Sequence, residues 1–191
     1  GLTAGLRGLG IVTGTILGVG VPHDTRALAH HAARVTAEGA GEVAAVLDVE
    51  AVRSGSWRAV GRELDSLRRA TQGATLTIVL ESAALTDDEV VRVCVMAQEA
   101  GADLVATSSG LHPAGGATLL AVSLMANTVG ATLGIKASGG IRTAAQAGAM
   151  VAAGATRLGI STTRAVLDEL VTAPAAPGLG GAPLAPRPSP E

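Results

Sequence analysis

The feature that most limits the fold of this 191-residue chain is a unit that recurs about every twenty to thirty residues. Each unit consists of a short apolar run, a polar or glycine-rich loop and an amphipathic stretch. The apolar runs, which we predict to be strands, are 11–20, 42–48, 75–82, 103–110, 132–140 and 156–161. Near-continuous apolar strands that alternate with helices are typical of a parallel sheet covered by helices. The chain is therefore predicted to be an α/β protein.

The helix boundaries carry recognisable signals. The segments "TDDE" at 86–89 and "TAAQ" at 143–146 fit a capping box, in which a hydroxyl at the N-cap is followed three residues later by Glu or Gln. Gly101 and Gly154 stand where a left-handed C-cap is expected, just before the next strand. These signals leave two architectures open, a doubly wound open sheet and a (β/α)8 barrel, and in both the functional residues lie at the carboxyl ends of the strands.

Composition excludes several classes of function. The net charge of -2 gives no reason to expect binding to nucleic acid or to a membrane, and no apolar run is long enough for a membrane span. Cys94 is the single cysteine, so no internal disulfide forms, and its helical spacing predicts a buried core thiol rather than a nucleophile. His23, His30 and His31 lack metal-site spacing, and we expect no metal or cofactor. The sequence is typical of a cytoplasmic protein.

The last part of the chain has a different composition. Residues 172–191 hold six of the eight prolines and almost no charge, which predicts a disordered or extended tail. Residues 1–171 are predicted to form one domain.

The segment "KASGGIRT" predicts an anion site. Its two glycines let backbone amides approach a ligand closely, and the helix that begins near Thr143 points its N-terminal amides to the same place. Arg142 adds a guanidinium, and the loop after the last strand adds further amides and hydroxyls. The alternative is a tight Gly-Gly turn without a ligand. The candidate phosphate-binding residues are Gly139, Gly140, Ile141, Arg142, Gly159, Ile160, Ser161 and Thr162.

From about residue 9 to 170 the chain resembles the deoxyribose-phosphate aldolase family, class I aldolases with a (β/α)8 TIM barrel. The resemblance rests on segments in the family's order, chiefly "GIKASGGIRT", "AGATRLGIS", "LESAALTDDE" and "EAGADLVATSSG". It implies that Lys136 assists proton transfer. It also implies that Gly139, Gly140, Arg142, Gly159 and Ser161 bind the phosphate of a sugar phosphate.

Three departures from the family's pattern stand beside this resemblance. Ala106 occupies the position of the lysine that forms the Schiff base, and a methyl group cannot form an imine. Ala44 replaces an aspartate that helps to move protons, and Asp48 lies roughly 13 Å further along the strand. The family's first two βα units have no counterpart, so about six units are expected, with open strand edges that a homo-oligomer or a hetero-complex would cover.

Three hypotheses of function follow. The chain is a working deoxyribose-phosphate aldolase, a related lyase, cyclase or isomerase with changed chemistry, or a non-catalytic subunit that binds a phosphorylated or other anionic small molecule. The loss of two catalytic positions favours the third. In the second, Lys136 acts as a cation, an acid or base, or a relocated nucleophile. Glu81 is a second candidate catalytic residue, and its alternative role is that of a structural acceptor for loop amides. Other polar groups near Lys136 would include Ser82, Thr107, Ser108, Ser109 and His112, although His112 also suits a surface residue.

Overall fold

The structure, a computed structural model, describes residues 12–20 and 23–172. Its centre is a six-stranded sheet in which all neighbouring strands run parallel. Each predicted run contains one strand, which is shorter than the run because the run also includes residues of the adjoining loops. The strands are β1 (Gly14–Leu17), β2 (Glu42–Val46), β3 (Thr75–Val79), β4 (Leu104–Ala106), β5 (Gly134–Ser138) and β6 (Arg157–Gly159).

The order of the strands decides between the two architectures. The sheet runs β1-β2-β3-β4-β5-β6, so each strand lies beside its predecessor in the chain and the order never reverses. A doubly wound sheet reverses its order at a switch point, whereas a (β/α) barrel does not. The curled sheet is thus a TIM-barrel-like assembly of six units, as predicted, with β1 and β6 as the edge strands among the described residues.

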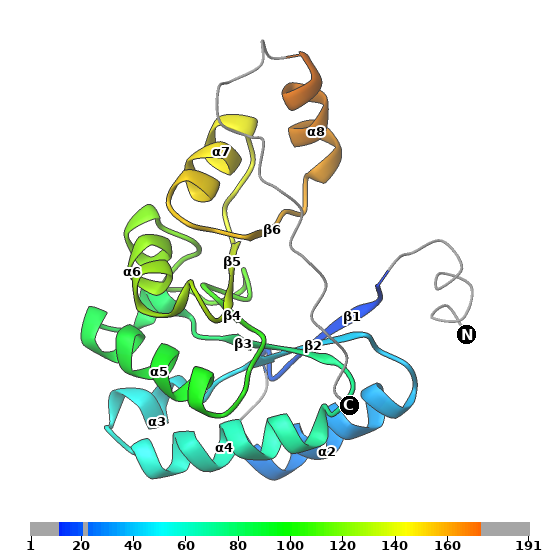
Figure 1. The fold of residues 1–191 in the computed structure, drawn as a ribbon, viewed down its shortest axis with the longest axis vertical. Coiled ribbons are helices and arrows are strands. Elements are labelled where there is room, and N and C mark those ends of the chain that lie inside the picture. The colour runs from blue at the N-terminus through cyan, green and yellow to red at the C-terminus, as the bar shows by residue number, and fades with distance from the viewer. Residues whose placement is uncertain (1–11, 21–22, 173–191) are drawn as a thin grey trace.

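The helices cover one side of this curled sheet (Figure 1). They are α2 (Thr25–Ala37), α3 (Val49–Arg53), α4 (Trp57–Ala70), α5 (Asp87–Glu99), α6 (Leu119–Val129), α7 (Ala144–Ala152) and α8 (Thr163–Thr172), together with the 3-10 helix η1 (Ser82–Ala84). Both predicted capping boxes are formed, by Thr86 with Glu89 and by Thr143 with Gln146. Gly101 and Gly154 follow their helices with positive φ angles of 79° and 110°, which confirms the predicted C-caps.

Alternate residues of each strand face opposite sides of the sheet. The outward residues, such as Val43, Ile78 and Ile135, belong to the large hydrophobic core shared with the helices. The inward residues form a much smaller apolar cluster of Ala44, Val46, Val79 and Ala106. The interior of the curled sheet is therefore only partly filled by apolar side chains, and this leaves room for a site.

Cys94 lies on α5 within the outer core and has no exposed surface. Burial raises the pKa of its thiol to about 12, so it stays protonated and unreactive at neutral pH. The prediction of a core thiol is confirmed.

Two other predictions concern the chain as a whole. Of the predicted tail, residues 173–191 lie outside the described residues. Within the described ranges, none of the helices combines the length and apolar character that a membrane crossing requires.

Candidate active site

A cavity of about 720 Å³ opens on the inner face of the sheet and at the carboxyl ends of its strands. Its strand residues include Glu42 and Ala44 of β2, Ala106 of β4 and Lys136 of β5. The loops that follow the strands supply 108–111, 139–142 and 160–161. Parallel α/β folds place their active sites at this edge.

The structure brings together the three positions at which the family resemblance predicts catalytic groups. Ala106 and Lys136 are register partners on the adjacent strands β4 and β5, so their side chains point to the same face of the sheet. Ala44 and Ala106 belong to the same inner apolar cluster, and all three residues line the cavity. The methyl group of Ala106 therefore lies beside the amine-bearing side chain.

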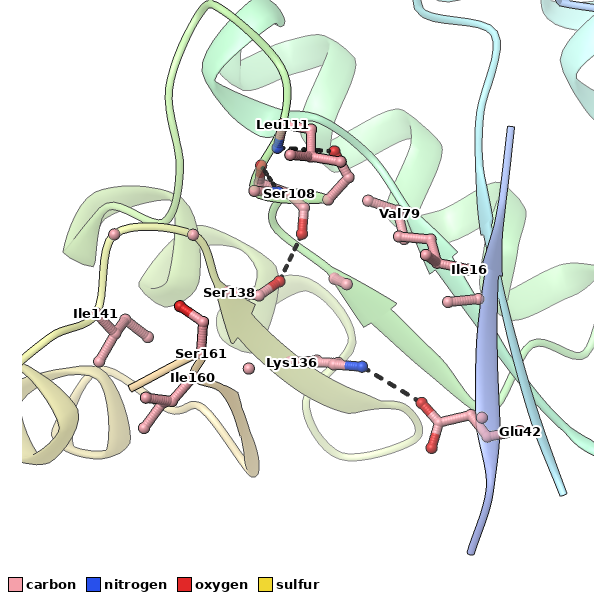
Figure 2. Close-up of a pocket in the computed structure, with 18 of the residues that line it drawn as sticks. Ile16, Glu42, Val79, Ser108, Leu111, Lys136, Ser138, Ile141, Ile160 and Ser161 are labelled. Carbon is pink, nitrogen blue, oxygen red and sulfur yellow. Dashed lines mark hydrogen bonds and ion pairs between the residues drawn. The ribbon is translucent and has the colours of Figure 1, made fainter. Parts of the chain in front are cut away.

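Lys136 is the only lysine in the sequence. Its side chain crosses the interior of the curled sheet toward β2, and its Nζ lies 3.5 Å from Oε1 of Glu42 (Figure 2). The side chain is one-quarter exposed, at 25%. It is an amine that a ligand can reach, held beside a carboxylate.

Glu42 was missed in the sequence analysis, although it precedes Ala44 by two residues and so faces the same side of β2. Its side chain is 15% exposed. Oε1 accepts a hydrogen bond from Thr77 Oγ1 at 3.2 Å, and Oε2 is paired with the guanidinium of Arg157. The alternation of residues along the strand was the signal that would have placed Glu42 in the site.

The first predicted phosphate loop has the geometry that its glycines suggested. Gly139 and Gly140 have φ angles of 91° and 84°, in the left-handed region that favours glycine. Their amides donate to no acceptor among the described residues, and both glycines line the cavity. The amides of Arg142 and Thr143, in contrast, donate to Oε1 of Gln146 at 2.8 and 3.2 Å. The capping box thus occupies these amides of the helix start, whereas the amides of the two glycines have no acceptor among the described residues.

The second predicted loop lies beside the lysine. Gly159, Ile160 and Ser161 line the cavity, whereas Thr162 does not and its carbonyl accepts a hydrogen bond from the Val166 amide at the start of α8. A Cβ atom at Gly159 would lie 3.6 Å from Cε of Lys136 and 2.6 Å from Cβ of Ser138. The close approach of Ser138 therefore favours glycine at this position, which lies at contact distance from the Lys136 side chain.

Glu81 lies behind the site rather than in it. Its side chain is buried and accepts hydrogen bonds from Ser108 Oγ at 2.9 Å and from the Ser109 amide at 3.0 Å. It does not line the cavity. The contacts are those of a structural acceptor that holds the loop after β4, one of the two roles that the sequence left open.

The remaining predicted pocket residues divide into two groups. Ser108 and Ser109 line the cavity. Thr107 is buried outside it and bonds through its hydroxyl to the backbone of Ser138, while Nδ1 of His112 accepts from the Ala114 amide within its own loop. Neither Thr107 nor His112 contacts the cavity.

Comparison with known proteins places this geometry in a family, although no family model matches the chain. The chain is 50% identical over 165 residues to a deoxyribose-phosphate aldolase of Nocardia farcinica, and the match covers 85% of this chain and 74% of that protein. It is 53% identical over 152 residues to a deoxyribose-phosphate aldolase of Mycobacterium tuberculosis, with 78% of this chain and 68% of that protein covered. The chain belongs to the deoxyribose-phosphate aldolase family.

Solved structures agree with this family and with the fold. The deoxyribose phosphate aldolase of Aeropyrum pernix superposes with a TM-score of 0.80 at 27% identity, over 90% of this chain and 73% of that one. A protein described as QR15, an aldolase, gives a TM-score of 0.77 at 29% identity, over 84% of this chain and 73% of that one.

These comparisons correct the function that the sequence analysis favoured. A non-catalytic subunit was expected because Ala44 and Ala106 replace two catalytic groups of the deoxyribose-phosphate aldolase family. Curated relatives that are 50% and 53% identical over most of the chain are named deoxyribose-phosphate aldolase, and this contradicts the expectation of a non-catalytic subunit. That expectation judged the site by two side chains, although Lys136 and the residues of both glycine loops line one cavity.

Proposed function

We propose that this protein is a deoxyribose-phosphate aldolase that cleaves a phosphorylated deoxy sugar through an imine formed on Lys136. One observation carries the proposal: the only lysine of the sequence lies in the cavity beside Ala106, the position from which the family resemblance expects the amine. An imine requires a primary amine on a side chain that the substrate can reach. Lys136 meets that requirement, and Ala106 leaves space next to it.

The proposed reaction divides a difficult cleavage into easier steps. The neutral amine of Lys136 adds to the aldehyde carbon of the open-chain sugar, and loss of water gives an iminium ion. This cation withdraws electrons as the C2–C3 bond breaks and the C3 hydroxyl loses its proton, which releases glyceraldehyde 3-phosphate. The enamine that remains is protonated at carbon and hydrolysed to acetaldehyde and free Lys136. Covalent catalysis of this kind lowers the barrier because the iminium accepts the electrons that a neutral carbonyl accepts poorly.

The phosphate end of the substrate would lie on the two glycine loops. Gly139 and Gly140, whose amides have no acceptor among the described residues, line the cavity together with the exposed Arg142. Backbone donors together with a guanidinium suit a phosphate group. Ile141, Ile160 and Ser161 gather on the side of Lys136 away from Glu42, so the amine lies between these loops and the carboxylate (Figure 2).

We propose in addition that the protein assembles with copies of itself. The related aldolase of Aeropyrum pernix is described as tetrameric. In this chain the edges of β1 and β6 have no partner strand among the described residues, and unpaired edges of this kind favour association. Light scattering tests this, since a stable, folded monomer at low concentration would contradict it. A hetero-complex remains a prediction of the sequence analysis.

The proposed function is tested by trapping the imine. Folded protein is incubated with deoxyribose 5-phosphate and sodium borohydride, digested, and mapped by mass spectrometry. Reduction of the acetaldehyde imine leaves an ethyl group on the amine, and we expect this group on Lys136. Omission of the sugar and the Lys136→Met variant are the controls, and both should lack the modified peptide. Absence of the adduct from the folded protein, or turnover without it, would contradict the proposal.

A further inference from the structure

The inward side of β2 carries a carboxylate two residues before Ala44, the position at which the family resemblance expects one. Glu42 is the only acidic residue among the described residues that line the cavity. Its Oε1 accepts a hydrogen bond from the amine of Lys136 at 3.5 Å. Ala44, at the position where the family resemblance expects an aspartate, has no titratable group. We infer that Glu42 is the acid and base that moves protons during imine formation on Lys136, an inference that rests on the proposed function.

The surroundings of Glu42 fix the direction in which its carboxylate points. Oε2 is held by Arg157 of β6, and Thr77 of β3 donates to Oε1. One oxygen is thus anchored by the guanidinium, while the other is presented to the amine. The side chain is mostly buried, at 15% exposure, which limits competition from water. A carboxylate held in this way is preorganised for proton exchange with one partner.

The proton transfers balance without any further reagent. Glu42 takes one proton from the ammonium of Lys136, which leaves a neutral amine and a carboxylic acid. The amine adds to the aldehyde, and the proton on nitrogen passes to the new oxygen to give a neutral carbinolamine. Glu42 then returns its proton to the carbinolamine hydroxyl, which leaves as water. The products are the iminium ion, water and the carboxylate, so Glu42 is regenerated.

A different role for Glu42 makes the opposite prediction. If the carboxylate were only a counter-ion, it would stabilise the unreactive ammonium form of Lys136, and its neutralisation would leave imine formation unchanged or make it faster. If Glu42 shuttles the proton, the same change slows imine formation. The rate of imine formation therefore separates the two roles, whereas stability alone would not.

The experiment compares Glu42→Gln with the unmodified protein and with Glu38→Gln. Glutamine retains the size of the side chain and an oxygen for Arg157 but cannot exchange a proton. Glu38 carries an exposed carboxylate at the end of α2, paired with Arg34, and its loss is the matched control for removal of one negative charge. We expect borohydride trapping at Lys136 to slow by roughly 10²–10⁴-fold in Glu42→Gln, the range typical of general acid and base catalysis. Glu38→Gln should trap at the unmodified rate.

The outcomes distinguish this inference from the function on which it rests. If the unmodified protein forms no adduct, the proposed function fails. If it forms the adduct and Glu42→Gln forms it equally fast or faster, only the role of Glu42 is overturned. Circular dichroism checks the folding of each variant. Should Glu42→Gln fail to fold, Glu42→Asp, which keeps the charge opposite Arg157, decides: slower trapping supports the shuttle and an unchanged rate overturns it. Formate that restores trapping in a folded Glu42→Ala variant would support it further.

Discussion

The two faces of the same sheet differ in what determines their residues. On β5, Ile135 and Ala137 face outward and have no exposed surface, whereas Lys136 and Ser138 face the cavity and are partly exposed. The outward residues belong to a core that joins the strands to the helices, while the inner apolar cluster contains only four buried residues. Packing constrains the residues of the outer face, whereas chemistry constrains those of the inner face. Substitutions at neighbouring residues of one strand should therefore have different effects: loss of stability on the outer face and loss of activity on the inner face.

The largest effect should come from the inner face. Lys136→Met removes the only lysine while it keeps a long, flexible side chain. Without a primary amine no imine forms, and we expect retro-aldol activity on deoxyribose 5-phosphate to fall by at least about 10³-fold, equivalent to about 4 kcal/mol of barrier. A coupled assay for glyceraldehyde 3-phosphate measures this loss. Thermal unfolding should change little. Activity within tenfold of the unmodified protein would mean that the amine is elsewhere.

The adjacent outward residue should behave in the opposite way. Ile135→Ala opens a cavity in the outer core, and such a change costs about 2–5 kcal/mol of unfolding free energy. Urea denaturation measures this cost, and kcat per folded molecule should stay close to that of the unmodified protein. If instead Ile135→Ala reduced kcat as strongly as Lys136→Met, the separation between the two faces would be lost.

The sequence predicted the local features of this fold well. The apolar runs located all six strands, and the hydroxyls of Thr86 and Thr143 located two helix starts, because both signals depend on residues close together in the chain. The choice of a barrel-like sheet needed the strand order, a long-range property that periodicity does not contain.

The site was harder to predict for the same reason. Lys136 and its carboxylate partner are 94 residues apart in the sequence, and their contact depends on the curl of the whole sheet. Glu81 shows the reverse error: it ends an apolar run and suggested catalysis, but its backbone turns into the left-handed region at φ 54° and its carboxylate binds a loop. The sequence pointed to Glu81 and passed over Glu42, and only the fold shows that Glu42 is the one that lines the cavity.

A smaller effect on KM should distinguish a glycine of the proposed phosphate loop from a glycine of an ordinary turn. Gly140 and Gly73 have nearly the same backbone, with φ angles of 84° and 87°, and a Cβ atom at either would meet nothing within 4 Å. Alanine at each should cost roughly 1–2 kcal/mol, because side chains disfavour the left-handed region. Only Gly140 lines the cavity, so only Gly140→Ala should also raise KM for the sugar phosphate. Equal KM values for the two variants would contradict the proposal that this loop binds the phosphate.

The smallest effect should come from a polar pair outside the cavity. Nε2 of His23 lies 3.0 Å from Oε2 of Glu63, a buried side chain on α4. The hydrogen bond to Glu63 raises the pKa of His23 above its ordinary value of 6.5, and burial opposes this only in part. A group whose pKa is raised on folding stabilises the native state fully below its unfolded pKa. That stabilisation is lost as the pH rises through the folded pKa.

We therefore expect the free energy of unfolding in urea to fall modestly as the pH rises from about 6 through neutrality. His23→Gln keeps a donor for Glu63 but cannot titrate, so this part of the slope should disappear. His31→Gln removes an exposed imidazole on α2 and should leave the slope in place. Because His23 does not line the cavity that contains Lys136, we expect the substitution to leave kcat unchanged. If the pH dependence of stability persists in His23→Gln, another group causes it. If kcat changes together with stability, the helical side of the sheet influences the cavity, and the separation between the two faces is contradicted.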